Sequence, residues 1–312
     1  MESDAKRKDM GFFILMVAAM LFWGGSWVSG KLVSSAAAPE EIVFWRFLFS
    51  FAAFLPLFLS SILRQRQKIP HIHGSWLPGL LWACLSAGIL ICYNHLLFHG
   101  LRYGLAGKGG IIVTTMNPMF TLVLSRLITG EPLLKNQKIG LLIGIAGGVL
   151  LVSPWNYTFS EILESGNLLF LAAALAWASL TTVSASAQRH VSGLMYNVLL
   201  YGLATAFNLA LFRGANFSGL GSLPAGFWLN VLYLAVFAGA IGTGLYFVAA
   251  KRFGSGKAGS FTFLVPGFAV LLSWLILGEV PGFSIISGGI LAITAVWMIN
   301  RNNAVKPVKT SQ

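Results

Sequence analysis

The sequence predicts an all-α membrane protein with ten transmembrane helices, arranged as two inverted five-helix repeats. Three observations lead to this prediction. Only 10% of the 312 residues are charged and 56% are apolar, whereas about 25% of residues are charged in a typical soluble domain. Ten apolar segments follow one another along the chain. Motifs of the first half also return in the second half, which indicates an internal duplication.

The ten segments are joined by short connections that contain helix-breaking residues such as Pro39, Pro132 and Pro281. About 20 mostly apolar residues are enough to cross a bilayer. The expected helices are 12–32, 42–62, 77–99, 107–128, 138–153, 167–187, 194–212, 227–249, 258–277 and 283–299. They leave no room for a soluble catalytic domain.

The positions of the basic residues predict the orientation of these helices. If the N-terminus lies in the cytoplasm, the outer side holds only four of the 21 lysines and arginines, which are Lys31, Arg102, Lys108 and Arg213. Arg46 lies within the second helix, and the other sixteen fall on the inner side. Basic residues collect on the cytoplasmic side of membrane proteins. We therefore expect a multi-pass inner (cell) membrane protein with both termini in the cytoplasm, and the net charge of +12 does not predict nucleic-acid binding.

The internal repeat relates the two halves at a nearly constant offset. Equivalent residues are Trp23 and Trp177 at an offset of 154, Arg102 and Arg252 at 150, Lys108 and Lys257 at 149, and Gly130-Glu131 and Gly278-Glu279 at 148. Each half contains five expected helices, so the second half must enter the membrane upside down. We expect one half to span residues 1–155 and the other residues 156–312, ending in a short cytoplasmic tail. Inverted repeats are a recurring plan of transporters, with the substrate held near the midplane.

Several motifs together resemble a known family. They are Trp23-Gly24-Gly25-Ser26-Trp27, Trp45-Arg46-Phe47, and the stretch from Gly100-Leu101-Arg102-Tyr103 through Pro118 to Gly130-Glu131. Their order and spacing are similar to those of the drug/metabolite transporter superfamily, and specifically its EamA-type family. The resemblance covers roughly residues 10–300. It implies that each half is one EamA-type repeat and that the protein transports a small metabolite, often by exporting an amino acid.

The carboxylates indicate how such a transporter is driven. All nine lie at the ends of expected helices or in connections. Proton- and sodium-driven carriers usually place an Asp or Glu inside the membrane. Facilitated diffusion, or coupling through a histidine, is therefore favoured over a carboxylate relay. An embedded enzyme would need clustered acid, base or metal ligands, so we expect no catalytic residue, no cofactor and no metal.

Two aromatic residues are candidates for substrate binding. Trp23 and Trp177 lie near the middle of the first and sixth expected helices, at equivalent positions of the repeat. Aromatic belts lie at membrane interfaces, not at the centre. Two tryptophans at the midplane suit a flat or amphipathic solute, through stacking or cation–π contact. Packing between helices is the alternative interpretation.

The third expected helix carries a polar group of residues, which are Tyr93, Asn94, His95 and His99. Polar side chains at membrane depth must face protein or water. His95 has the chemistry to titrate near neutral pH and to gate a cavity. The alternative is a neutral histidine that bridges two helices. His95 and His99 alone do not predict a zinc site, because further ligands are needed.

Three more residues are candidates for contact with the solute. Arg46 can bind a substrate carboxylate through two hydrogen bonds, or else extend to lipid phosphate or pair with Glu40. Asn117 precedes Pro118, whose missing N–H frees a backbone carbonyl, and Thr114 lies one turn away. A purely structural kink at Pro118 is the alternative.

We therefore expect a transporter, not an enzyme, that moves a small organic metabolite outward by alternating access. The expected substrate-binding residues are Trp23, Arg46, Tyr93, Asn94, His95, Thr114, Asn117 and Trp177. The expected partners are a small-molecule solute and the lipid bilayer. The chain is a monomer or a homodimer, since the stripe of Gly140, Gly144 and Gly148 allows close packing within one chain or between two. A membrane-embedded lipid-modifying enzyme and a regulatory membrane subunit are the alternatives.

Overall fold

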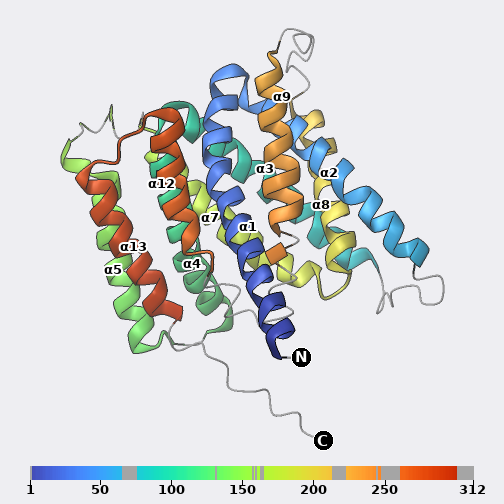
Figure 1. Ribbon diagram of the computed structural model, residues 1–312, viewed down its shortest axis with the longest axis horizontal. Helices are drawn as coiled ribbons and strands as arrows, with labels where there is room; N and C mark the ends of the chain where they lie inside the picture. Colours follow the sequence, from blue (N-terminus) through green and yellow to red (C-terminus); the bar gives the residue numbers. More distant parts are fainter. Residues whose placement is uncertain are drawn as a thin grey trace, which may run out of the picture.

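The computed structural model shows a bundle of long helices that follow the apolar segments of the sequence (Figure 1). It describes residues 2–64, 76–130, 132–156, 158, 160–161, 165–212, 223–243, 245–246 and 261–300. Within these ranges every regular element is a helix, which confirms the predicted all-α class.

Five long helices form the first half of the chain. They are α1 (Glu2–Ala36), α2 (Pro39–Arg64), α3 (Trp76–Tyr103), α4 (Ala106–Thr129) and α5 (Lys135–Val152). Each covers one of the predicted segments. Pro39 begins α2, where a missing N–H breaks no helical hydrogen bond, whereas α4 continues through Pro118.

The second half begins after a short 3₁₀ turn, η1 (Pro154–Asn156). Its helices are α7 (Asn167–Ala187), α8 (Gly193–Leu211), α9 (Ala225–Leu232), η3 (Tyr233–Gly242), α12 (Leu264–Leu277) and α13 (Phe283–Asn300). The predicted segment 227–249 starts as the α-helix α9 and continues as η3, a π-helix. Part of the predicted segment 258–277 lies outside the described residues.

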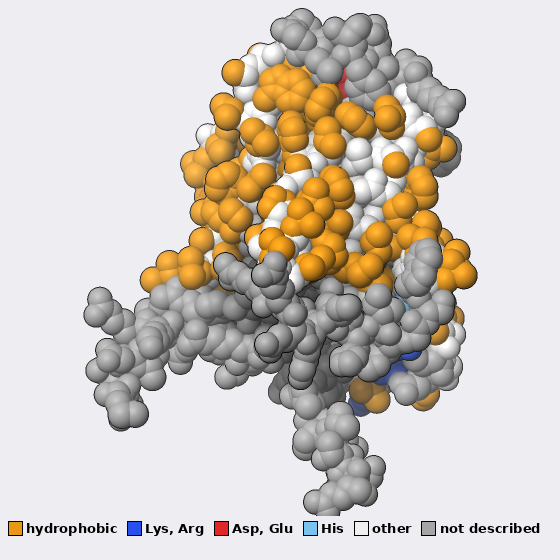
Figure 2. Space-filling model, turned by 90° about the vertical axis from the view of Figure 1, so that its right-hand side faces the viewer, with side chains coloured by type: hydrophobic (Ala, Val, Ile, Leu, Met, Phe, Trp, Pro, Cys, Tyr) orange, Lys and Arg blue, Asp and Glu red, His pale blue; other side chains and the backbone are white. Residues whose placement is uncertain are grey.

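Eight spans in the described chain are long and apolar enough to cross a membrane, and α12 and α13 are shorter apolar helices. Hydrophobic side chains cover the described face in Figure 2, and the basic side chains visible there gather near its lower end. Large apolar residues such as Leu127 and Phe283 are 74% and 85% exposed. A surface of this kind is a liability in water and is expected in contact with lipid.

Helices of the two halves pack against one another instead of forming two separate bundles. In Figure 1, α1 lies between α12 and α9, and α5 and α13 lie side by side at one edge. The most extensive packing between the halves joins α5 to α13, α3 to α7, α4 to α7, α1 to α12 and α2 to α8. Residues at the centre of the molecule therefore come from both halves.

Small residues bring α5 and α13 into close contact. A Cβ atom on Gly147 would lie 3.0 Å from the Gly288 oxygen and 3.0 Å from the Ala292 nitrogen. Gly148, which the sequence groups with Gly140 and Gly144, instead faces Met116 of α4 at 3.6 Å. Small residues at such contacts allow two helix backbones to approach closely. The α5 glycine in close contact with α13 at this level is therefore Gly147 and not Gly148.

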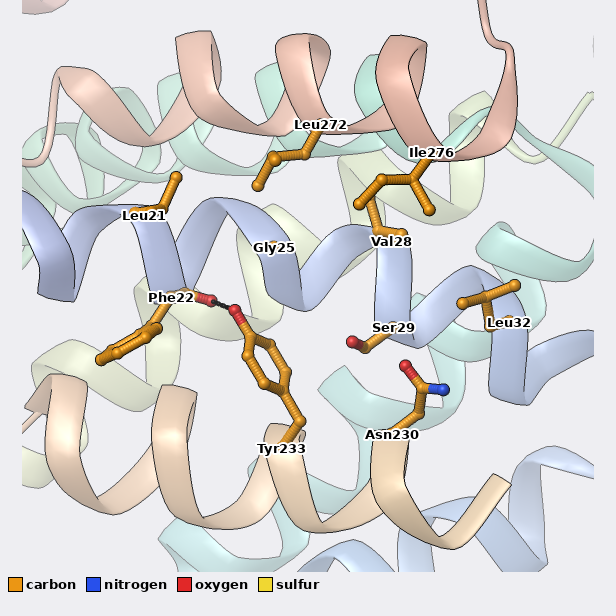
Figure 3. A pocket seen from close by; sticks show the side chains of 10 residues that line it. All are labelled: Leu21, Phe22, Gly25, Val28, Ser29, Leu32, Asn230, Tyr233, Leu272 and Ile276. Atoms are coloured by element: carbon orange, nitrogen blue, oxygen red, sulfur yellow. Dashed lines mark hydrogen bonds between the residues drawn. The ribbon is translucent and has the colours of Figure 1, made fainter. Parts of the chain in front are cut away.

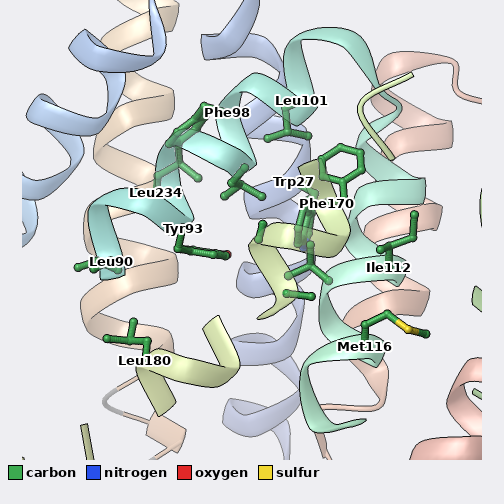
Figure 4. Close-up of a cluster of buried hydrophobic side chains, with 14 of the residues drawn as sticks. Trp27, Leu90, Tyr93, Phe98, Leu101, Ile112, Met116, Phe170, Leu180 and Leu234 are labelled. Carbon is green, nitrogen blue, oxygen red and sulfur yellow. The ribbon is translucent and has the colours of Figure 1, made fainter. Parts of the chain in front are cut away.

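The main buried cluster runs through the bundle, and part of it lies between α1, α3, α4 and α7 (Figure 4). Phe170 of α7 is fully buried at its centre. Added Cβ atoms on Gly100, Gly104 and Gly109 would lie 2.7, 2.8 and 2.6 Å from its ring. These glycines of α3, α4 and the connection between them therefore make room for the Phe170 ring.

The repeated Gly-Glu motif ends two equivalent helices. Gly130 follows α4 and Gly278 follows α12, each with φ of 70°. Only glycine adopts this left-handed conformation readily, and it satisfies the last carbonyls of a helix. The motif is therefore a helix stop in both halves.

Two charged residues bind helix ends near the connection between α1 and α2, which we call the α1–α2 end. The Glu279 carboxylate accepts hydrogen bonds from the backbone N–H groups of Ala106 and Gly107, both at 3.0 Å. It thus caps the N-terminus of α4, where a negative charge also suits the helix dipole. The Lys31 ammonium donates to the carbonyls of Leu101 and Gly104, at 2.6 and 2.7 Å. The α1–α2 end is therefore closed by charged contacts to both helices of the α3–α4 pair.

Candidate functional site

Trp23 lies in the middle of α1 and is held by residues of the second half. Its indole Nε1 donates a hydrogen bond of 2.8 Å to the Ala238 carbonyl in η3. Its ring centroid lies 5.5 Å from that of Tyr246, at an angle of 41°. A Cβ on Gly242 would lie 2.7 Å from the indole nitrogen. The glycine thus makes room for the ring, and the π-helix supplies the acceptor.

Trp177 of α7 lies against Tyr93 of α3. Their ring centroids are 4.7 Å apart, at an angle of 54°. Tyr93 is buried, whereas Trp177 is 37% exposed. Within the described residues the indole N–H of Trp177 donates no hydrogen bond. This tryptophan therefore has a partly exposed ring and, within the described residues, an indole N–H that bonds to no acceptor.

These two aromatic pairs are equivalent in the internal repeat. Trp177 follows Trp23 by 154 residues, and Tyr246 follows Tyr93 by 153. Each pair joins the two halves, because Trp23 contacts Tyr246 and Trp177 contacts Tyr93. The sequence analysis did not pair Tyr246 with Trp23, but the repeat offset applied to Tyr93 would have pointed to this residue.

Arg46 of α2 lies beside α3. Its guanidinium donates a 2.9 Å hydrogen bond to the Asn94 Oδ1 atom and sits 5.7 Å from the centre of the Phe98 ring. The Asn94 amide nitrogen donates to the Leu90 carbonyl at 2.8 Å, which turns its oxygen toward Arg46. No carboxylate pairs with Arg46 in the part of the chain that the structure describes. Its positive charge therefore has a neutral partner.

The polar residues of α3 point toward three different helices. Tyr93 contacts Trp177 of α7, and Asn94 accepts from Arg46 of α2. His95 bonds through Nε2 to Asn208 of α8, at 3.0 Å. Successive residues of a helix point about 100° apart. These residues are neighbours in the sequence and lie at one level of α3. Their side chains nevertheless contact three different helices.

Thr114 and Asn117 use their polar atoms within α4. The Thr114 hydroxyl donates to the Gly110 carbonyl at 2.6 Å, and the Asn117 Oδ1 atom accepts from the Thr121 hydroxyl at 3.1 Å. Both residues are half-buried. Among the described residues, no hydrogen bond joins them to the other predicted site residues.

A groove of about 420 Å³ lies between α1, α12 and the continuous α9–η3 helix (Figure 3). Most of its lining is apolar, and the exposed side chains of Leu21 and Leu32 belong to it. Its polar groups come from Ser29, Asn230 and Tyr233. The Tyr233 hydroxyl donates to the Phe22 carbonyl at 3.1 Å. The sequence did not predict this groove.

The described carboxylates lie away from both aromatic pairs. Glu40 and Glu41 belong to the first turn of α2, Glu279 to the α12–α13 connection, and Glu161 to the connection before α7. Helices this apolar, with aromatic contacts that join the two halves, define an integral membrane protein.

Comparison of the sequence with models of known families identifies the family to which this membrane protein belongs. The model of the EamA-like transporter family matches residues 11–153 and again residues 164–301. The chain therefore belongs to the EamA-like transporter family, which confirms the resemblance noted in the sequence.

Curated relatives are similar along most of the chain. A WAT1-related chloroplastic protein of Arabidopsis thaliana is 26% identical over 92% of this chain and 68% of its own length. The uncharacterized transporter YetK of Bacillus subtilis is 26% identical over 88% of this chain and 82% of its own. A protein of Salmonella typhimurium named "Probable amino-acid metabolite efflux pump" is 24% identical, over 94% of both chains. These relatives bear the names of transporters, pumps or related proteins and not of enzymes.

A solved crystal structure has a similar fold. It superimposes with a TM-score of 0.58 and 18% identity, covering 93% of this chain and 97% of its own. At that identity the likeness concerns the fold alone.

Proposed function

We propose that this chain exports a small organic metabolite with a carboxylate group, such as an amino acid, by alternating access. The observation that carries this proposal is the equivalence of the Trp23–Tyr246 and Trp177–Tyr93 pairs. Each half supplies aromatic residues to both pairs, so a solute bound between them contacts both halves. The printed name of the Salmonella relative supports the choice of an amino acid.

The proposed architecture has ten transmembrane helices in two inverted halves, residues 1–155 and 156–312. The two successive matches of the family model support this division. The chain resides in the inner membrane with both termini in the cytoplasm. The bias of lysine and arginine toward one side supports that orientation.

Arg46 gives the proposed site its preference for a carboxylate. Its guanidinium is bound to the neutral Asn94 amide, and a hydrogen bond between two charged groups is stronger than one with a neutral partner. A carboxylate would replace the amide oxygen as the acceptor. Asn94 follows Tyr93 directly on α3, so the carboxylate would bind at the same level of the helix as the Trp177–Tyr93 pair.

Alternating access requires the closed α1–α2 end to open. The Lys31 contacts to Leu101 and Gly104 join α1 to α3, and the Glu279 contacts join the α12–α13 connection to α4. A passage between these helices at this end needs both sets of hydrogen bonds to break. The described carboxylates lie outside the apolar helix interiors, so the proposed cycle has no carboxylate relay.

The proposal is tested by flux measurements on purified protein in proteoliposomes. The vesicles are loaded with labelled amino acids, or with the matching amines that lack the carboxylate. We expect saturable efflux of at least one amino acid and none of its decarboxylated amine. Trp177→Ala abolishes most of this flux, whereas Trp274→Ala, a change of a similarly exposed tryptophan on α12, does not.

Two results would contradict the proposal. Folded protein that moves no solute of either class would remove the transport assignment. Equal loss of flux in Trp177→Ala and Trp274→Ala would remove the assignment of the site to the aromatic pairs.

A further inference from the structure

Three side chains with metal-binding atoms meet near the α1–α2 end. They are Glu40 in the first turn of α2 and His95 and His99 on successive turns of α3. One ligand atom of each residue lies within 4.8 Å of the other two, and all three residues are half-buried. Glu40 is 55 residues away from His95 in the sequence. Only the packing of α2 against α3 supplies this third ligand.

A second layer of contacts orients His95 for this role. The buried Asn208 of α8 donates from its amide nitrogen to the Glu40 backbone carbonyl at 3.0 Å. Its oxygen therefore faces the His95 Nε2 atom, 3.0 Å away, and Nε2 must carry the proton. The lone pair of neutral His95 is then on Nδ1. Metal-binding histidines generally donate their other N–H to an oxygen in this way.

The His95 ring is also held from one side. The Phe212 ring lies 4.5 Å from it, at an angle of 31°. A ring fixed by stacking and by a hydrogen bond loses little freedom when it binds an ion. His95 therefore bridges two helices through Nε2, as one interpretation of the sequence expected. Its Nδ1 atom remains available to bind an ion.

The distances and charges suit a small divalent cation. Ligands about 2.0–2.2 Å from a tetrahedral zinc ion are about 3.3 Å apart. The present separations of up to 4.8 Å therefore need to shorten by at most about 1.5 Å, which side-chain rotation can supply. Two neutral imidazoles and one carboxylate carry a charge of −1. The nearest basic residue on α2, Arg46, lies six residues along the helix, about 9 Å away.

We propose that Glu40, His95 and His99 bind one divalent transition-metal ion, with zinc preferred, at the α1–α2 end. Water fills the fourth position, as is usual where the protein provides three ligands. The ion ties the first turn of α2 to α3. Asn208 acts as a positioning residue, because it orients His95 without contacting the ion. This site is separate from the proposed transport function, so its test needs no solute.

The experiment measures metal binding to purified chain from which any affinity tag has been removed. The protein in detergent is stripped with a chelator and titrated with Co²⁺, whose visible absorption reports four- or five-coordinate binding. Zn²⁺ is then added to displace the Co²⁺. We expect one Co²⁺ per chain, complete displacement by Zn²⁺, and an increase in the unfolding temperature on Zn²⁺ binding.

Four variants distinguish metal binding at this site from unspecific metal binding. Glu40→Gln and His99→Ala should each weaken Zn²⁺ binding by more than about 100-fold, since loss of even an orienting residue weakens metal sites 10- to 100-fold. Glu41→Gln is the matched control, because it removes the neighbouring charge but no ligand, and it should bind as the parent protein does. Asn208→Ala should weaken binding by about 10- to 100-fold while keeping the Co²⁺ absorption band at saturation.

The proposal fails if the parent chain binds no Co²⁺ in this titration. It also fails if Glu40→Gln and Glu41→Gln bind Zn²⁺ equally well, which would mean that surface charge alone attracts the ion. The apparent unfolding temperature of each stripped variant shows that it is folded. His190→Ala, a change of a histidine outside the cluster, must leave binding unchanged.

Discussion

The two equivalent aromatic pairs differ in how firmly they are held. The Trp23 ring is fixed by a hydrogen bond to the Ala238 carbonyl and lies 5.5 Å from Tyr246. The Trp177 ring lies closer to its partner Tyr93, at 4.7 Å, but it is 37% exposed and donates no hydrogen bond within the described chain. Both pairs join the two halves, but only the Trp23 ring is also fixed by a hydrogen bond among the described residues, and the Trp177 ring is partly exposed.

The two tryptophans also differ in what surrounds them. Gly242 lies next to the Trp23 ring and ends the π-helix η3, whereas α3 is an ordinary α-helix throughout. Glycine and the π-helix together bring the Ala238 carbonyl within reach of the Trp23 indole.

The largest expected effect comes from removing each tryptophan and measuring stability. Trp23→Ala should lower the free energy of unfolding by about 3 kcal/mol, since it leaves a cavity and an unsatisfied carbonyl. Trp177→Ala should lower it by less than about 1 kcal/mol, because the exposed ring has fewer contacts to lose. Chemical unfolding in detergent, followed by far-UV circular dichroism, measures both values. Equal destabilisation would remove the distinction between the pairs.

A smaller effect is expected from filling the space beside Trp23. Gly242→Ala places a methyl group 2.7 Å from the indole nitrogen, and overpacking of this kind costs about 1–3 kcal/mol. Gly267→Ala on α12 is the control, because no atom lies within 4 Å of the added Cβ. It should stabilise the helix by about 0.5–1 kcal/mol. If both substitutions shift the unfolding midpoint in the same direction, the space around Trp23 is not limiting.

Replacing each indole by a phenyl ring tests the hydrogen bond alone. Trp23→Phe should destabilise the protein by about 1 kcal/mol, because the Ala238 carbonyl loses its donor. Trp177→Phe should leave stability unchanged and weaken solute binding by about 2- to 10-fold, since a phenyl ring attracts cations less than an indole and donates no hydrogen bond. Binding of labelled solute and thermal unfolding are measured on the same preparations. A loss of stability in Trp177→Phe alone would reverse the proposed roles.

The smallest expected effect concerns the closed α1–α2 end. Glu279→Gln keeps one oxygen acceptor but removes the charge that favours the N-terminus of α4, so it should destabilise by about 0.5–1 kcal/mol. Glu161→Gln, in the exposed connection before α7, is the control and should have no measurable effect on the unfolding midpoint. A midpoint unchanged in Glu279→Gln would show that the dipole contributes little here.

Apolar composition was enough to predict most of the helices. The predicted segment 167–187 coincides with α7, and 194–212 differs from α8 by one residue at each end. The extent of a membrane helix depends on a continuous apolar run, which is a local property of the sequence. The π-helix η3 was not predicted, because the apolar run that contains it is continuous with that of α9.

The contacts of the candidate site were harder to predict, because they depend on how helices rotate against one another. The sequence placed Tyr93, Asn94 and His95 in one group, and the structure directs them to α7, α2 and α8. The spacing of residues in the sequence did not predict that Glu40 lies beside His95 and His99. The internal repeat would have been a stronger guide, since an offset of 153 leads from Tyr93 to Tyr246.

The cap on α4 has a consequence for how the protein is made. Glu279 lies 173 residues after Ala106, whose N–H it accepts. At about 5–20 residues per second, a ribosome needs roughly 9 to 35 s to cover that distance. During this interval α4 is complete but its first turn has no carboxylate to receive its N–H groups. A nascent chain arrested before Glu279 should therefore show faster amide exchange at Ala106 and Gly107 than the finished protein does.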